Sequence, residues 1–177
     1  MFVDARSTPP RVAAVLVSDG AILYSDMAPS EEVSKFSCVC CSCFALVHYQ
    51  VMATFKERDD GHIMSLELLA IAFGLSVFGE RLRGMNLELY SDNTGAERAT
   101  AKGGSREWDH SCIAHCIWFV IFIHMLFSHV FLRSCRSKAL QLQMGLWVSR
   151  VPSKDNISDD PSRLCVRPTM GHNMLMY

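Results

Sequence analysis

The chain has 177 residues, of which 50% are apolar. This is enough to bury one hydrophobic core, so we expect a single domain. The formal net charge of −1 excludes a general electrostatic attraction to nucleic acid, so such a partner would require metal ions or local basic patches to offset its phosphate charge.

The N-terminal residues predict a three-stranded antiparallel meander. A first strand runs through Phe2-Val3 to Asp4, and Thr8-Pro9-Pro10 breaks it. Residues 11–17 are β-branched and small apolar residues, Ser18-Asp19-Gly20 is a turn signal, and residues 21–24 form the next short strand.

Residues 64–78 are apolar nearly all round, which is typical of a helix that is buried on several sides. Glu67 is the only acidic residue in this segment and lies near its start. An isolated acid in such surroundings must find a partner or change its pKa. Gly84 then ends the helical region.

The run 86–90 alternates between polar and apolar residues, which predicts a strand. Asp92 follows it directly. Thr94 and Glu97 have the spacing of a capping box, so we expect Thr94 to cap a helix that continues through Ala101. Asp92 is therefore expected at the C-terminal end of a strand, where open α/β sheets bind their ligands.

The remaining elements are a helix over 108–118, a last strand that starts at 146 and leads into Val151-Pro152, and a loop or helix start at 156–163 that contains Asp159. The order predicts an α/β fold. We expect a five-stranded mixed sheet, an antiparallel meander followed by parallel strands, with helices on its faces.

Four blocks of this sequence resemble the signature blocks of the RNase H domain of retrotransposon reverse transcriptases, within the ribonuclease H superfamily. They are Phe2-Val3-Asp4-Ala5, Leu66-Glu67-Leu68-Leu69-Ala70, Leu89-Tyr90-Ser91-Asp92-Asn93 and residues 151–163. No single block is specific, but all four occur in the right order, each with its carboxylate in register. The resemblance covers roughly residues 2 to 163.

The resemblance implies an endonuclease that cleaves RNA in RNA–DNA hybrids with two Mg²⁺ ions, for which Mn²⁺ can substitute. Asp4 would bridge both ions, and Glu67, Asp92 and Asp159 would complete the site. Oxygen ligands suit such hard cations, and two ions about 3.5–4 Å apart can support in-line phosphodiester hydrolysis. The side chains expected to contact nucleic acid are Asn93, Arg98, Lys102, Arg106, Lys154 and Asn156. A polymerase domain of the parent element is a further expected partner.

Simpler interpretations exist for single residues. Asp4 alone would be a surface turn residue, Asp92 a helix-capping acid, and Asp159 part of a solvated acidic loop. The sequence also departs from the family pattern. The stretch 150–155 lacks the histidine that cellular enzymes carry before the last aspartate, and Thr8-Pro9-Pro10-Arg11 replaces a glycine-rich turn.

Two segments, 33–50 and 119–136, fit nothing in the domain, which would otherwise span 1–163. Our preferred hypothesis is that both are translated introns, because each is 18 residues long and can encode splice signals in a compatible phase. The run 113–132 has about the length of a membrane helix, although its histidines count against that. The tail, 164–177, has no clear periodicity and is expected to be irregular.

The eight cysteines are interpreted as reduced thiols in an intracellular protein, cytoplasmic or nuclear. Four of them crowd into six positions, where they could hardly bridge one another. An alternative is a zinc site that combines this cluster with His48, although the paired ligand spacing is missing. No secretory signal is expected, because the first residues lack a basic stretch followed by an apolar one.

Two alternative functions remain open. The first is a catalytically silent, nucleic-acid-binding remnant of the same fold, which would keep its basic residues as phosphate contacts. The second, less favoured, is a membrane-associated protein anchored through 113–132.

Overall fold

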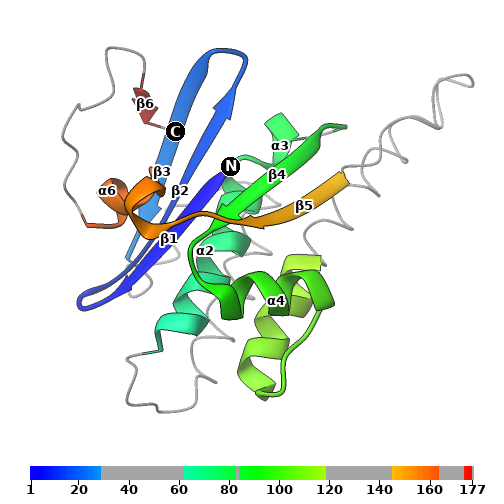
Figure 1. Ribbon diagram of the computed structural model, residues 1–177. Coiled ribbons are helices and arrows are strands. Elements are labelled where there is room, and N and C mark those ends of the chain that lie inside the picture. The colour runs from blue at the N-terminus through cyan, green and yellow to red at the C-terminus, as the bar shows by residue number, and fades with distance from the viewer. Residues whose placement is uncertain (29–61, 83, 119–144, 164–173, 177) are drawn as a thin grey trace, which may run out of the picture.

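The computed structural model describes residues 1–28, 62–82, 84–118, 145–163 and 174–176 (Figure 1). The two segments interpreted as translated introns, 33–50 and 119–136, lie outside the described residues, and so does the cysteine cluster with His48. The interpretations of these segments therefore stay predictions. Among the described cysteines, Cys112 and Cys116 are free thiols.

The expected meander is present. Strands β1 (Phe2–Ser7), β2 (Pro10–Ser18) and β3 (Ala21–Met27) pair in antiparallel fashion. The two-residue loop Asp19-Gly20 joins β2 to β3, and both residues have positive φ, 50° and 77°. This is the backbone geometry of the tight hairpin turns that Asp-Gly pairs favour.

The parallel part of the sheet consists of β4 (Asn86–Ser91) and β5 (Gly145–Arg150). Together the described strands form one six-stranded sheet in the order β5-β4-β1-β2-β3-β6. The expected five strands are all present. The sixth, β6 (Met174–Met176), lies parallel to β3 at the sheet edge. It belongs to the tail that was expected to be irregular, so that expectation was wrong for these three residues.

Helix α2 (Ile63–Val77) is the central helix, and it packs against β1 and β2. Its apolar residues are buried along almost the whole length, as the sequence predicts. The helix approaches the sheet closely at Gly74, where an added Cβ would lie 2.8 Å from the Cβ of Ala14 and 3.0 Å from the Sδ of Met1. Only glycine fits there without displacing its neighbours.

The other helices surround this core. They are α3 (Gly79–Leu82), α4 (Thr94–Lys102), the helix 108–118, the 3₁₀ helix Ser153–Asp155 and α6 (Asp159–Ser162). Helix α4 packs against α2 and β5, and α6 packs against the meander. Helices α2 and α6 therefore both contact β1 and β2.

Candidate active site

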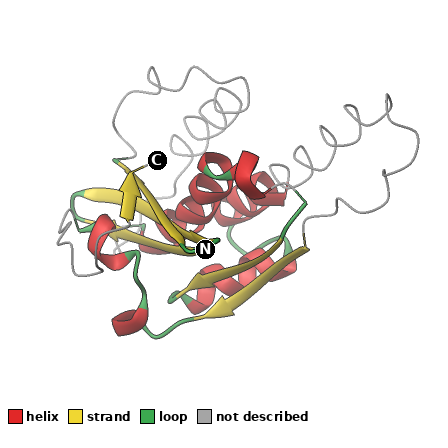
Figure 2. Ribbon diagram, turned by 90° about the horizontal axis from the view of Figure 1, so that it is seen from above, coloured by secondary structure: helices red, strands yellow, loops and turns green. Residues whose placement is uncertain are grey.

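The site lies where β1 and β4 separate. Their ladder has one register pair, Phe2 with Tyr90, supported by a hydrogen bond from Tyr90 N to Met1 O at 2.8 Å. In Figure 2 the meander and the β4–β5 pair accordingly form two distinct groups of strands. Further along β1, the backbone N–H of Ala5 donates to the Oε1 of Glu67 at 3.2 Å. A side chain from α2 thus enters the space between the two strands.

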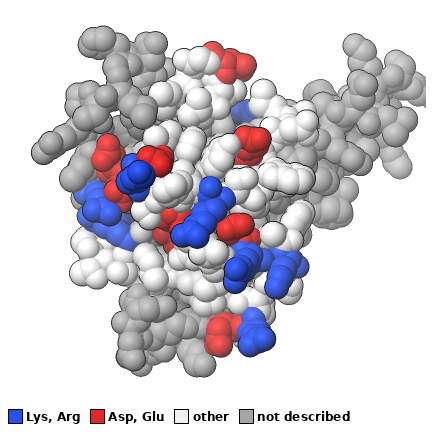
Figure 3. Space-filling view, viewed as in Figure 1, with Lys and Arg blue, Asp and Glu red and all other residues white. Residues whose placement is uncertain are grey.

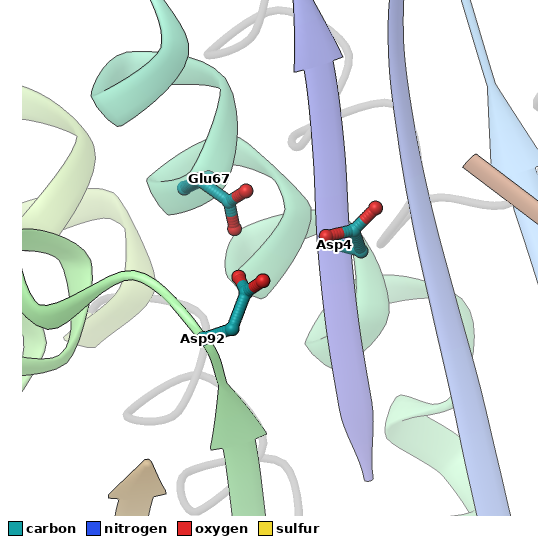
Figure 4. Close-up of side chains that lie close together, drawn as sticks. All are labelled: Asp4, Glu67 and Asp92. Atoms are coloured by element: carbon teal, nitrogen blue, oxygen red, sulfur yellow. The ribbon is translucent and has the colours of Figure 1, made fainter. Parts of the chain in front are cut away.

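Three of the four predicted carboxylates meet there. Asp4 comes from β1, Glu67 from the first turns of α2, and Asp92 directly follows β4 (Figure 4). One oxygen from each carboxylate lies within 4.8 Å of the others. Figure 4 shows Glu67 and Asp92 pointing toward each other, with one oxygen of Asp4 turned toward them. Three segments that are distant in the sequence therefore converge on one point.

Asp4 is almost fully buried, with 5% of its surface exposed. Burial, and to a smaller extent the negative charges of Asp92 and Asp159, raises the pKa of its carboxyl from 3.8 to about 6. The hydroxyl of Ser162 donates to its Oδ2 and lowers the pKa in part. A cation bound next to Asp4 would favour the ionised carboxylate and lower this pKa.

Glu67 is 3% exposed, and its pKa is raised well above the ordinary value by burial and by the neighbouring charges of Asp4 and Asp92. Its Oε2 is buried and has no hydrogen-bond partner among the described residues. A buried oxygen without a partner is costly, and such an atom next to two other carboxylates fits a site for a cation. Clustered carboxylate oxygens are the ligands that Mg²⁺ and Mn²⁺ prefer.

Local hydrogen bonds hold Asp92 in place. The Oγ of the buried Ser91 accepts from the backbone N–H of Asn93 at 3.2 Å. The side-chain oxygen of Asn93 in turn accepts from the N–H groups of Gly95 and Ala96 at 2.9 and 3.0 Å. Asn93 is therefore the N-cap of α4, and the prediction that Thr94 has this role was wrong by one residue.

Asp159, the fourth predicted carboxylate, lines the same cavity of about 560 Å³ as the other three. It does not belong to the close cluster. Its Oδ1 accepts from the Nε of Arg163 at 2.6 Å, one helical turn later. The structure thus brings together Asp4, Glu67 and Asp92, and leaves Asp159 at the edge of the site in an ion pair.

The residues expected to contact nucleic acid divide into two groups. Arg98, Lys102, Arg106 and Lys154 are exposed. On the face of the molecule drawn in Figure 3, Lys and Arg side chains are spread out with acidic side chains among them. Asn93 lines the cavity, with its oxygen engaged in the helix cap. Asn156 is only 4% exposed and donates to the carbonyl oxygen of Val3, so the structure gives it an internal position instead of the expected surface contact.

Other residues that line the cavity had no role assigned to them from the sequence, among them Arg6, Ser162 and Arg163. The spacing of Asp159 and Arg163, four residues apart, is a signal that could have predicted their ion pair. The contact of Ser162 with Asp4 joins residues 158 positions apart, and no local pattern predicts it. Arg6 donates to the carbonyl oxygen of Arg163, the residue that follows α6, at 3.2 Å.

Comparison with known proteins gives no relative. No protein-family model, curated protein or solved structure matches the chain. Among the described residues, no helix has the length and apolar character needed to cross a membrane. Of the run 113–132, considered above as an anchor, only residues 113–118 are among those described, where they end the helix 108–118.

Proposed function

We propose that this chain is an RNase H-type endonuclease of retroelement origin that hydrolyses the RNA strand of RNA–DNA hybrids with divalent metal ions. The observation that carries the proposal is the convergence of Asp4, Glu67 and Asp92, with one oxygen from each within 4.8 Å. The cavity also contains Asp159, so all four carboxylates that the resemblance implies line one space. The mixed α/β sheet, with its meander followed by parallel strands, is compatible with that fold.

The donor set fits Mg²⁺ or Mn²⁺. Asp4, Glu67 and Asp92 would hold an ion, and Asp159 is the nearest further carboxylate in the cavity. When bound, two such ions supply activation of a water molecule and stabilisation of the leaving oxygen. The protein itself contributes the rigid support: the N–H of Ala5 fixes Glu67, Ser162 holds Asp4, and the cap of α4 fixes the turn at Asp92.

The remaining parts of the cavity fit an anionic substrate once the carboxylates are neutralised. Arg6 and Arg163 line it, and exposed Arg98 and Lys102 lie on the neighbouring α4. Guanidinium groups pair readily with phosphate oxygens. The preference for RNA over DNA in such a site would come from contacts to the 2′-hydroxyl across the minor groove.

The test is cleavage of an end-labelled RNA–DNA hybrid by the full chain, with Mg²⁺, with Mn²⁺ and with a chelator. We expect metal-dependent loss of the RNA strand, and no cleavage of a DNA duplex of the same sequence. Asp92→Asn keeps the shape of the side chain but removes a charged ligand, so cleavage should fall to background. Asp155→Asn is the matched control, because Asp155 is exposed and does not line the cavity.

A second candidate function is that of a catalytically silent protein that binds nucleic acid. The position of Asp159 favours it, because this carboxylate is paired with Arg163 and stays outside the close cluster. The two candidates differ in one measurement. A folded protein that retains the hybrid in a gel-shift experiment but leaves the RNA strand intact at all metal concentrations supports the silent protein and contradicts the nuclease.

A further inference from the structure

The segment that carries Asp159 is already anchored at the site. The hydroxyl of Ser162, in α6, donates to the Oδ2 of Asp4, and it lies 2.9 Å from the main-chain oxygen of Asp159. Ser162 is fully buried, so water does not compete for this contact. The backbone of α6 is thus attached to β1 beside the cluster, and Asp159 lines the same cavity.

The Asp159 side chain, which is outside the close cluster, is held instead in an ion pair with Arg163. The Nε of Arg163 holds its Oδ1 at 2.6 Å, and the backbone N–H of Arg163 donates to the main-chain oxygen of Asp159 at 3.1 Å. The two residues are i and i+4 in one turn, so the pair forms locally and needs no other part of the fold. The Arg163 side chain is 63% exposed and the Asp159 side chain 34%, so the pair is weak enough to be broken.

We propose that Arg163 is a positioning residue that withholds Asp159 from the metal site. The cluster of Asp4, Glu67 and Asp92 accepts the first divalent cation as it stands. A second cation obtains Asp159 as a ligand only when the ion pair between Asp159 and Arg163 opens. The proposal rests on the proposed function, because it assigns an order to the metal ions of that same site.

The order of metal binding follows from the charges of these side chains. The first ion meets three converging carboxylates, one of them with a buried oxygen that lacks a partner among the described residues. The second ion must take one carboxylate away from a guanidinium, and it must do so next to a cation that is already bound. Removing the guanidinium should therefore strengthen the second binding step and leave the first almost unchanged.

The test is a calorimetric titration of the full chain with Mn²⁺ alone, in the absence of nucleic acid. Wild type is expected to bind one ion tightly and a second one more weakly. In Arg163→Gln the second ion should bind about fivefold more tightly, the size expected from a partly exposed ion pair. Arg81→Gln removes the same charge from an exposed position of α3 that does not line the cavity, and it should behave as wild type.

A double variant separates the specific effect from a general change in charge. In Asp159→Asn combined with Arg163→Gln, the gain at the second site should disappear, because the ligand itself is gone. An unchanged second affinity in Arg163→Gln, or a gain that persists in the double variant, would overturn the proposal. If Arg163→Gln does not fold, Arg163→Lys is titrated instead, for which we expect about a twofold gain, and no gain overturns the proposal equally.

Failure of the proposed function has a different signature. If wild type binds no Mn²⁺, or if Asp92→Asn leaves the first binding step unchanged, the cluster is not a metal site, and both proposals fail. If Asp92→Asn abolishes the first binding step but Arg163→Gln leaves the affinity for the second ion unchanged, only the role of Arg163 is refuted.

Discussion

The side-chain amide nitrogen of Asn156 donates a hydrogen bond of 2.9 Å to the main-chain oxygen of Val3, 153 positions earlier in the chain. The amide oxygen of Asn156 accepts from the hydroxyl of Ser158 at 2.7 Å. Both Asn156 and Ser158 are buried. The amide thus connects the loop before α6 to the strand that carries Asp4, and it fixes the two halves of the candidate site relative to each other.

Asn156→Ala is expected to destabilise the protein by about 1–3 kcal/mol, because it leaves the Val3 carbonyl and the Ser158 hydroxyl without this buried partner. Equilibrium unfolding in urea, followed by circular dichroism, measures the change in the free energy of unfolding. The exposed neighbour Asp155 provides the control, and Asp155→Ala should stay within about 0.5 kcal/mol of wild type. Equal stabilities for the two variants would show that the buried amide contributes nothing.

The buried carboxyl of Asp4 makes stability depend on pH. The pKa of this carboxyl rises from its ordinary value of 3.8 to about 6 in the folded protein. The folded state therefore binds the proton more tightly than the unfolded state does. Stability contributed by this group is therefore lost as the pH rises from about 4 to about 6. At neutral pH the ionised Asp4 costs roughly 3 kcal/mol relative to its protonated form.

Asp4→Asn removes that cost and should raise the free energy of unfolding by up to about 3 kcal/mol at pH 7.5 without metal. At pH 4.5 the gain should fall to about 1 kcal/mol, because the wild-type carboxyl is then mostly protonated in the folded state. Urea unfolding at both pH values provides the comparison. A gain that does not change with pH would mean that the carboxyl is not the group responsible.

A bound divalent cation should neutralise the buried carboxylates in place of a proton. At a concentration about 100 times the dissociation constant, a bound ion stabilises the folded state by about 2.7 kcal/mol. We therefore expect Mg²⁺ or Mn²⁺ to raise the melting temperature at about pH 7.5, and to do so much less at about pH 5, where protons compete for Asp4.

A chelator should reverse this stabilisation, because it removes the ion and restores the repulsion among the carboxylates. The Asp92→Asn variant should fold, but added metal should no longer raise its melting temperature. A shift of the same size in this variant would place the cation elsewhere on the chain.

The strands and α2 could be predicted from local patterns, because alternation and apolar runs follow directly from which face is buried. The cap of α4 was misplaced by one residue, since Asn93 and Thr94 are both good capping residues and only the backbone geometry distinguishes them. Strand β4, which leads to Asp92, was correctly predicted from the alternating residues 86–90.

The geometry of the candidate site was predictable only in part. The convergence of Asp4, Glu67 and Asp92 was expected from the resemblance, and the cluster of their carboxylates agrees with it. The burial of Asn156 was not predictable, because its partner Val3 is far away in the sequence and residues 153–160 are polar apart from Ile157. The edge strand β6 was missed, since three residues are too few for any periodicity to be visible.

Gly74 tests how closely α2 packs on the sheet. Gly74→Ala adds a Cβ that would meet the Cβ of Ala14 at 2.8 Å, so either the helix or β2 must shift. Overpacking of this kind costs about 1–3 kcal/mol, which exceeds the advantage of alanine in a helix. Thermal and urea unfolding measure the loss. The variant Ala14→Gly in the same background should restore part of the stability, and no recovery would show that the two positions are not in contact.

The exposed residues Arg98 and Lys102 lie four positions apart on α4 and are predicted to contact the phosphates of a bound hybrid. If each neutralises one phosphate, replacing both with glutamine should weaken binding equally for different sequences. The slope of the logarithm of affinity against the logarithm of salt concentration should become less steep by about 2.

The measurement is a fluorescence-anisotropy titration of a labelled hybrid at several salt concentrations, with Ca²⁺ in place of Mg²⁺. Arg81→Gln, on α3, is the control and should leave the slope within experimental error of wild type. An unchanged slope in the double variant would exclude Arg98 and Lys102 from the nucleic-acid interface and would leave Lys154, in the 3₁₀ helix, as the next candidate contact.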